Sequence, residues 1–347
     1  MTDLHFKYGS RTVEYRYVTV RNGVEHMNVN VISASINYDS DAAIKRTARF
    51  ELVPDGIDFL NDFMRVYMVV NKTNYCLGTF VMATPTYKKT DGVKTAEVEA
   101  YDKTIILKED CFTEQTYFAA GSRYDAVIGR IISVLGVDAV IPTITQTLPT
   151  DREFEIGTSR LSAVNKLLDE INYNPIIADE YGEFIISKYV TPSVSEVTKE
   201  YMDDAFSIIS SDISLTADYF GVPNVFLATC ENPDADEIYY AKYVNDNPSS
   251  PLSTISRGRN IVSSIYKPDS ICCQSDLDEY IKRKAYEDSL VYDTLTIQTA
   301  NVPQHGYREI VRIKCGDVQG VYVEKSWEMD LSIGAMMRHY LVGVNPI

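Results

Sequence analysis

The side chains best suited to acid–base chemistry or metal binding are few and widely separated. The sequence contains no HExxH, GxSxG or P-loop motif, the patterns that carry zinc, serine-nucleophile and phosphate chemistry. The four histidines are His5, His26, His305 and His339. His339 falls in a predicted strand, where a lone histidine is more often a packing residue than a ligand. The histidines therefore predict neither a catalytic site nor a metal site.

The cysteines predict free thiols. Cys272 and Cys273 are adjacent, but vicinal cysteines have neither zinc-finger nor thioredoxin spacing. The start of the chain has no signal-peptide pattern, and no apolar run is long enough to span a bilayer. We therefore expect no membrane segment, folding in a reducing cytoplasm, and no disulfides. The other cysteines are Cys76, Cys111, Cys230 and Cys315.

Clustered carboxylates are the remaining candidates for chemistry. The run ENPDADE, residues 231–237, suggests calcium but lacks the loop glycine and distal glutamate of an EF-hand, so a solvated loop is favoured. A glycosidase needs two carboxylates at a defined separation, and the sequence singles out no pair. We therefore expect no catalytic residue, no cofactor and no metal, and the chain is not predicted to be an enzyme.

The overall charge is strongly acidic. The 347 residues carry a net charge of −16 with a pI near 4.7. Binding nucleic acid through a basic surface is therefore not expected, because phosphate contacts need clustered Lys and Arg. A channel wall that repels DNA and ordinary solubility charge both fit this composition. The length favours two or more domains.

The first 110 residues show short alternating runs separated by turn formers such as Asn22-Gly23, a pattern typical of an antiparallel barrel or sandwich. Residues 56–63 predict one or two helical turns with Ile57, Leu60 and Phe63 facing inward. The alternating runs are residues 12–20, 27–38, 47–53, 65–71, 75–82 and 95–101.

Residues 111–190 predict a compact α/β unit of two helices and a hairpin. One helix begins at Ser122 and ends near Gly136. The second is capped by Ser159 and has an apolar stripe at helical spacing. Strands at 175–178 and 183–187 follow, joined by a turn from Asp179 to Gly182. The stripe comprises Leu161, Val164, Leu167, Leu168 and Ile171.

Residues 191–347 predict further strands with a helical insertion at about 260–292. After a soft boundary at 191–195, strands at 206–215 and 224–229 precede a polar stretch, 231–259, that is expected to be a long surface loop. Ser275 is expected to cap a helix that ends near Leu290. The remaining residues predict β structure.

The two ends of the chain show a similar pattern. A strand, a turn, a Gly-x-aromatic-Val segment and a later strand occur at residues 66–70, 78–81 and 96–100, and again at 310–314, 320–323 and 337–341. Chance similarity and duplication of one barrel both explain this pattern, because Gly before an aromatic strand is common in β proteins.

Several short motifs occur in an order that resembles the phage tail baseplate hub family. This family includes the tail hubs of contractile phages, of tail-like bacteriocins and of related long-tailed phages. The similarity spans nearly the whole chain. The motifs are TARFEL (47–52), GTF (78–80), EAYDK (99–103) with Leu107, GTSRL (157–161), NxLL (165–168), INY (171–173), DExG (179–182), NDxP (245–248), residues 251–259, GD (316–317) and GxY (320–322).

This resemblance implies an α+β, mostly β fold. Two tube-like antiparallel β-barrels, residues 1–110 and 191–347, would flank the small α/β domain at 111–190, with the helical insertion in the second barrel. It also implies a homotrimeric ring that adapts a hexameric tail tube to a trimeric tip spike. Closed cyclic symmetry makes such a ring physically reasonable.

The implied partners are the tail tube or tube-initiator protein, the tip spike protein, and baseplate and tape-measure proteins. DNA would pass through an acidic channel without specific binding. The expected location is the virion tail or a tail-like particle, assembled in the bacterial host cytoplasm. The chain ends soon after its last predicted strand without a fused hydrolase domain, which favours a contractile tail. A tail-tip peptidoglycan hydrolase and a host-carbohydrate-binding tail protein are the alternatives.

Overall fold

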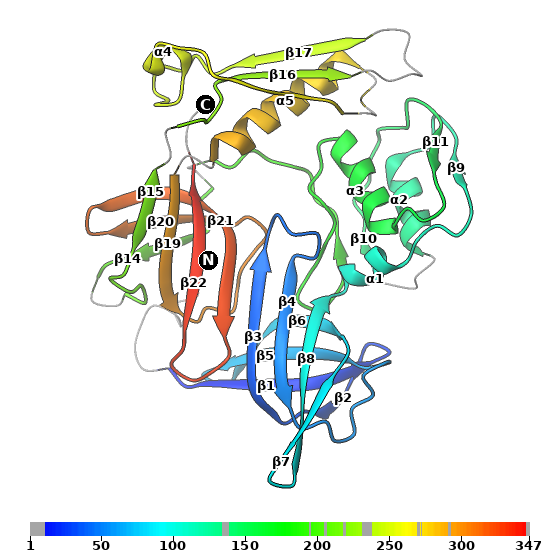
Figure 1. Cartoon of the computed structure of the whole chain (residues 1–347), viewed down its shortest axis with the longest axis vertical. Helices are drawn as coiled ribbons and strands as arrows, with labels where there is room; N and C mark the ends of the chain where they lie inside the picture. The colour runs from blue at the N-terminus through cyan, green and yellow to red at the C-terminus, as the bar shows by residue number, and fades with distance from the viewer. Residues whose placement is uncertain are drawn as a thin grey trace.

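The fold is dominated by strands arranged around one large sheet (Figure 1). The structure, a computed structural model, describes residues 11–133, 139–193, 196–204, 207–217, 220–230, 238–268, 271, 273–290 and 293–344. Across these residues, every helix is too short or too polar to cross a membrane.

The N-terminal barrel comprises eight strands with the neighbour order β3-β4-β8-β6-β5-β1-β2, and β7 pairs with β8. The strands are β1 (Val13–Arg21), β2 (Val24–Asn28), β3 (Val31–Asp39), β4 (Arg46–Leu52), β5 (Phe63–Val70), β6 (Thr73–Met82), β7 (Thr86–Thr90) and β8 (Val93–Asp102). The alternating runs are confirmed as strands, except that residues 27–38 divide into the end of β2 and β3. The expected helical turns at 56–63 are wrong: Phe63 begins β5, and Leu60 is 95% exposed.

The α/β unit lies beside this barrel (Figure 1). Its elements are α1 (Thr104–Glu109), β9 (Thr116–Phe118), α2 (Tyr124–Ser133), β10 (Ala139–Val140), β11 (Arg152–Phe154), α3 (Arg160–Glu170), β12 (Ile177–Ala178) and β13 (Phe184–Ile185). The cap at Ser159 is confirmed, since its hydroxyl accepts a hydrogen bond from the Ser162 N–H at 3.2 Å. The predicted end of the first helix at Gly136 lies outside the described residues.

The hairpin of this unit is confirmed, and its turn contacts the N-terminal barrel. Thr79 Oγ1 donates a hydrogen bond to the Glu180 carbonyl at 2.9 Å, and the Arg46 guanidinium lies 2.9 Å from the Glu180 carboxylate. Gly182 closes the turn with φ +85°, a conformation that disfavours side chains.

An insertion forms a separate layer, a three-stranded sheet with order β17-β16-β18 against which α5 packs (Figure 1). Its elements are β16 (Val225–Cys230), β17 (Tyr239–Val244), α4 (Thr254–Arg257), β18 (Val262–Tyr266) and α5 (Gln274–Ser289). The expected surface loop at 231–259 is therefore wrong in part, because it contains β17 and α4. The cap residue of α5 is Cys273 rather than Ser275.

The C-terminal barrel has the neighbour order β15-β19-β22-β21-β20-β14. Its strands are β14 (Lys199–Met202), β15 (Ser214–Ala217), β19 (Asp293–Ala300), β20 (Ile310–Cys315), β21 (Val318–Asp330) and β22 (Met336–Gly343). The order matches β3-β4-β8-β6-β5-β1 of the N-terminal barrel strand for strand. One strand is reversed, since β14 runs parallel to β20 whereas β1 runs antiparallel to β5.

The repeated glycines have the same structural reason. Gly78 on β6 pairs with Val66 on β5, and Gly320 on β21 pairs with Ile313 on β20. An aromatic ring two residues later covers each glycine, because residues i and i+2 share one face of a strand. A Cβ would lie 2.6 Å from the Phe80 ring at Gly78 and 2.9 Å from the Tyr322 ring at Gly320.

The two barrels are joined by hydrogen bonding between β21 and β3, so their strands form one continuous sheet. Trp327 on β21 pairs with Tyr38 on β3, and their rings stack with centroids 5.7 Å apart. Both residues belong to the core of the N-terminal barrel, which therefore includes side chains from each end of the chain.

Replacing either covered glycine by alanine is expected to destabilise the protein, because the aromatic ring must move. We expect Gly78→Ala and Gly320→Ala each to lower the free energy of unfolding by about 1–3 kcal/mol, the cost of overpacking a core. Gly306→Ala is the matched control, since a Cβ there meets nothing within 4 Å. Denaturant unfolding tests this, and equal stability of the Gly320 and Gly306 variants would contradict it.

The core of the α/β unit is tested by a charge on α3. Leu167 is 0% exposed, so Leu167→Asp is expected to cost several kcal/mol of unfolding free energy by burying an unpaired carboxylate. Ser162→Asp is the control, because Ser162 is exposed in the first turn of the same helix, where a negative charge is tolerated. Thermal melting of both variants tests this prediction. A melting temperature of the Leu167→Asp variant equal to that of wild type would contradict the assignment of Leu167 to the core.

Candidate functional site

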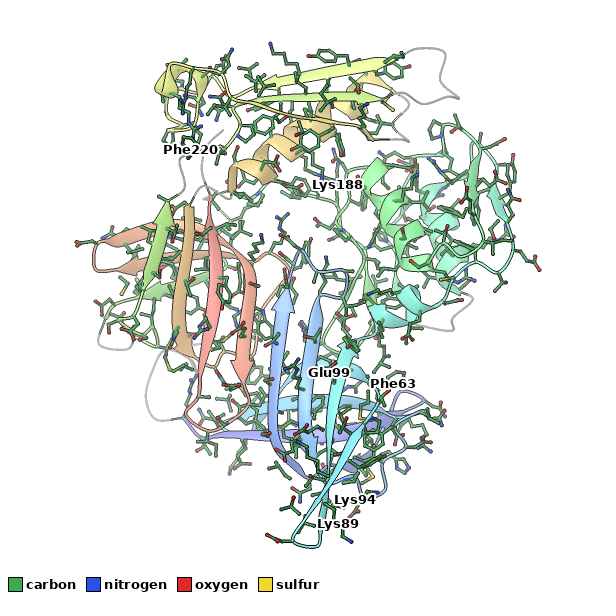
Figure 2. The ribbon with its side chains drawn as sticks, viewed as in Figure 1. Phe63, Lys89, Lys94, Glu99, Lys188 and Phe220 are labelled. Carbon is green, nitrogen blue, oxygen red and sulfur yellow. The ribbon has the colours of Figure 1, made fainter. Side chains whose placement is uncertain are left out.

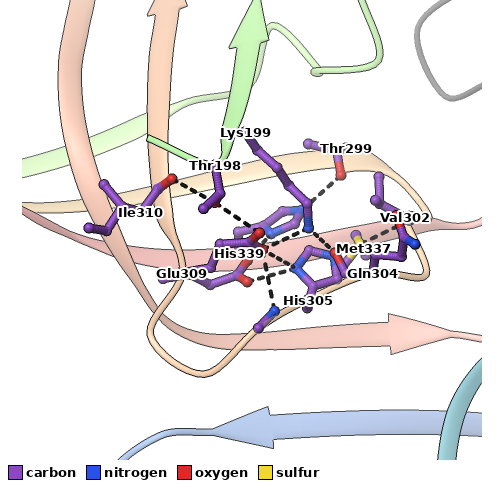
Figure 3. Close-up of polar contacts among 12 residues, drawn as sticks. Thr198, Lys199, Thr299, Val302, Gln304, His305, Glu309, Ile310, Met337 and His339 are labelled. Atoms are coloured by element: carbon purple, nitrogen blue, oxygen red, sulfur yellow. Dashed lines mark hydrogen bonds and ion pairs between the residues drawn. The ribbon is translucent and has the colours of Figure 1, made fainter. Parts of the chain in front are cut away.

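Two histidines and a glutamate meet in the interior of the C-terminal barrel. His339 lies on β22 and His305 in the loop between β19 and β20 (Figure 3). Glu324 lies on β21. The Nδ1 atoms of His305 and His339 lie 2.7 and 2.5 Å from the two carboxylate oxygens of Glu324. His305 is 8% exposed, and the other two residues are 0% exposed. All three offer metal-ligand atoms within 4.8 Å of one another.

Further polar side chains surround this His–Glu–His cluster (Figure 3). Nε2 of His339 lies 2.7 Å from Thr299 Oγ1 on β19. On the side of His305, the Lys199 ammonium on β14 pairs with the Glu309 carboxylate at 2.7 Å. Nε2 of His305 is buried and has no hydrogen-bond partner among the residues that the structure describes.

The electrostatics of the cluster favour an ionised carboxylate. Burial alone would raise the pKa of Glu324, but the charge and hydrogen bond of His305, and then those of His339, hold this pKa well below its ordinary value. Burial lowers the pKa of His305, and Glu324 opposes only part of that effect. The negative charge of Glu324 is therefore stabilised by the two neighbouring histidines rather than by water.

The N-terminal barrel provides an internal reference for this cluster. Met82 lies four residues after Gly78 and pairs with Ala100. Glu324 lies four residues after Gly320 and pairs with Leu341. Met82 is therefore the counterpart of Glu324, and by the same register Val98 is the counterpart of His339. Both counterparts are buried and apolar. The barrel fold itself thus does not require a charge here.

The histidines and cysteines considered in the sequence analysis occupy different parts of the structure. His305 and His339, treated separately in the sequence, come together, so the interpretation of His339 as a lone packing residue is incomplete. His26 is exposed on β2, and Cys273 caps α5. His5, Cys272 and residues 231–237 lie outside the described residues. Cys230 Sγ donates a hydrogen bond to the Ile271 carbonyl, and the other described cysteines are free thiols.

Sequence reasoning missed Glu324 because it treated the histidines alone. A signal was available in the repeat itself: counting four residues from each repeated glycine aligns Glu324 with an apolar methionine. A carboxylate at an inward position of an apolar strand indicates a buried polar partner.

Four strands of the large sheet pair on one side only among the described strands: β2 with β1, β7 with β8, β14 with β20 and β15 with β19. The path β15-β19-β22-β21-β3-β4-β8 ends at β15, which pairs only with β19, while β7 pairs only with β8 at the other end. Every residue of β7 and of β15 is exposed. Unpaired strand edges can add a strand from another chain.

The sheet face that points away from the two cores is acidic. Arg49 pairs with Glu99 at 3.2 Å and Arg338 with Glu328 at 3.7 Å on this face, and Figure 2 labels Glu99 on β8. Lys88 on β7 also pairs with Glu97, and the carboxylates outnumber these three cations. Adjacent strands bring to this face Asp39, Glu51, Glu97, Glu99, Glu328 and Asp330.

No family model and no curated protein matches the sequence. Solved structures of phage tail proteins do share its fold. A tail protein from Neisseria meningitidis MC58 is 14% identical with a TM-score of 0.67, covering 94% of this chain and 96% of that one. The 43 kDa tail protein of prophage MuSo2 from Shewanella oneidensis is 10% identical, with a TM-score of 0.66 and coverages of 94% and 98%.

Prophage tail protein gp18 from Listeria monocytogenes EGD-e has a TM-score of 0.62 at 9% identity, with 94% of both chains covered. These likenesses define the class: the chain has the mostly β fold of these tail proteins. The resemblance inferred from the short motifs is confirmed at the level of the fold.

Removing one member of the cluster is expected to lower the free energy of unfolding more than removing two members does. His339→Val leaves the buried Glu324 carboxylate with one partner and should lower the free energy of unfolding by about 3–5 kcal/mol. Adding Glu324→Met introduces the pair of residues that the N-terminal barrel has, and should restore part of that loss. Denaturant unfolding of both variants measures this, and a double variant less stable than the single one would contradict the charge argument.

Proposed function

We propose that the chain is a structural hub of a phage tail or tail-like particle, forming a homotrimeric ring of six barrels. The observation that carries the proposal is the single sheet that joins two barrels of equal strand order. Three such chains supply six similar barrels, which would let a threefold tip spike meet a sixfold tube.

The open edges suggest how the ring closes. Within one chain, β21 joins the barrels by pairing with β3. The equivalent contact between chains would bring the open edge of β15 in one copy to the open edge of β7 in the next, since both strands are fully exposed. Each interface would then be used once around a closed ring, and the edges of β7 and β15 would both be paired.

The acidic sheet face would line the bore of this ring. An excess of carboxylates repels phosphate groups, so DNA or the tape-measure protein could pass without being held. The proposed partners are the tube or tube-initiator protein, the tip spike, and baseplate proteins, in the virion tail assembled in the host cytoplasm. No observation favours the hydrolase or carbohydrate-binding alternatives, which cell-wall digestion and glycan-array assays would test.

The oligomeric state of the purified protein tests the ring, and light scattering should give the mass of three chains. Proline at Leu215 or at Thr216 provides the decisive variants. The N–H groups of neighbouring residues in a strand point to opposite sides, so one of the two prolines removes a donor on the open edge. That variant should remain folded but monomeric.

Prolines at Tyr239 and Tyr240 are the matched controls, because β17 is an edge strand of the insertion, which the ring does not use. These variants should remain trimeric. A monomeric or dimeric wild-type protein at all concentrations, or trimers that tolerate both β15 prolines, would overturn the proposed ring.

A further inference from the structure

The hydrogen bonds around His339 leave a lone pair facing a carboxylate. Thr299 Oγ1 lies 2.9 Å from the Ala300 carbonyl and donates its proton there. When the hydroxyl proton is donated there, the same oxygen accepts a hydrogen bond from Nε2 of His339 at 2.7 Å. With the ring proton on Nε2, a neutral His339 presents the lone pair of Nδ1 to Glu324 at 2.5 Å.

Two lone pairs at that distance repel, so a proton or a metal ion must lie between them. A second proton on His339 would satisfy this requirement, and so would a metal ion. His305 presents its own Nδ1 to the other oxygen of Glu324, with its Nε2 unpartnered and able to carry the ring proton. Both histidines can thus turn a lone pair toward the same carboxylate.

The donor set is that of a zinc site. Two imidazole nitrogens and a carboxylate bind Zn²⁺ in preference to Ca²⁺ or Mg²⁺, and they leave a fourth position open. The Glu309 carboxylate lies 3.9 Å from Nδ1 of His305 and could approach that position. Thr299 supplies the outer hydrogen bond that usually orients a ligating histidine.

Charge and space are both compatible with an ion. Glu324 offsets one of the two charges of Zn²⁺, as the single carboxylate of a His₂Glu zinc site does, while Glu309 is neutralised by its pair with Lys199. Ligand atoms around tetrahedral zinc lie roughly 3.3 Å apart, given Zn–N bonds of about 2.0–2.1 Å. The present 2.5 and 2.7 Å separations are hydrogen-bond lengths, so each ligand would withdraw by less than about 1 Å on binding.

We propose that His305, Glu324 and His339 bind a Zn²⁺ ion that fastens β21, β22 and the loop between β19 and β20 together inside the C-terminal barrel. The apolar Met82 and Val98 at the counterpart positions show that the barrel can close without such a group. Zn²⁺ replaces the proton between His339 and Glu324, and that proton leaves to solvent.

The test uses the full chain, stripped with a chelator and then titrated with Zn²⁺ or Co²⁺. We expect one Zn²⁺ per chain by elemental analysis, a higher melting temperature with Zn²⁺, and the visible absorption of low-symmetry, near-tetrahedral Co²⁺. These readouts depend on the metal itself and not on assembly, so they are independent of the proposed hub function.

Two variants make the test specific. Glu324→Met combined with His339→Val carries the residues of the N-terminal barrel and should fold, yet show neither the Co²⁺ absorption nor the Zn²⁺ shift. His26→Gln removes an exposed histidine on β2 and should retain both. A wild-type protein that binds no metal, and so holds only protons in the cluster, would overturn the site. So would equal binding by the double variant, or loss of binding in His26→Gln.

Discussion

The pairing of β21 with β3 is the constraint on which the rest of the structure depends. β21 is thirteen residues long, with its first half paired to β20 and its last five residues paired to β3. A bulge between Glu324 and Ser326 separates the two halves. Because a one-residue shift changes which face a side chain occupies, Glu324 can point into one barrel and Trp327 into the other.

The same bulge determines the character of the outer face. After it, Glu328 and Asp330 alternate outward while Met329 is buried. Their neighbours on β3 continue the row, so the two barrels present one polar surface across the junction. The α/β unit and the insertion attach at the periphery: Glu180 contacts Arg46 of the barrel, and Arg283 of α5 donates a hydrogen bond to Asn172 at 3.1 Å.

Elements with strong local signals were predictable from the sequence. Ser159 and Gly182 each act within a few residues, and the stripe that includes Leu167 has helical period, so the two longer helices and the hairpin of the α/β unit were predicted, whereas α1, β9, β10 and β11 were not. The strands β7 and β17 were missed because their exposed residues give no clean apolar alternation. The error at residues 56–63 arose from helical spacing that tertiary structure overrides, since Leu60 faces solvent.

The cluster could not be placed from local signals, because its members lie 15 to 34 residues apart and meet only through strand register. Comparison of the two barrels indicates which of these features the shared fold requires. Gly78 and Gly320 retain the same packing device, which the shared fold requires, whereas Met82 and Glu324 differ completely in polarity. A buried charge is costly to keep, so its presence in only one of two otherwise similar barrels indicates a constraint that the fold does not impose. The two copies are therefore equivalent in topology and distinct in chemistry, as a ring with threefold rather than sixfold symmetry permits.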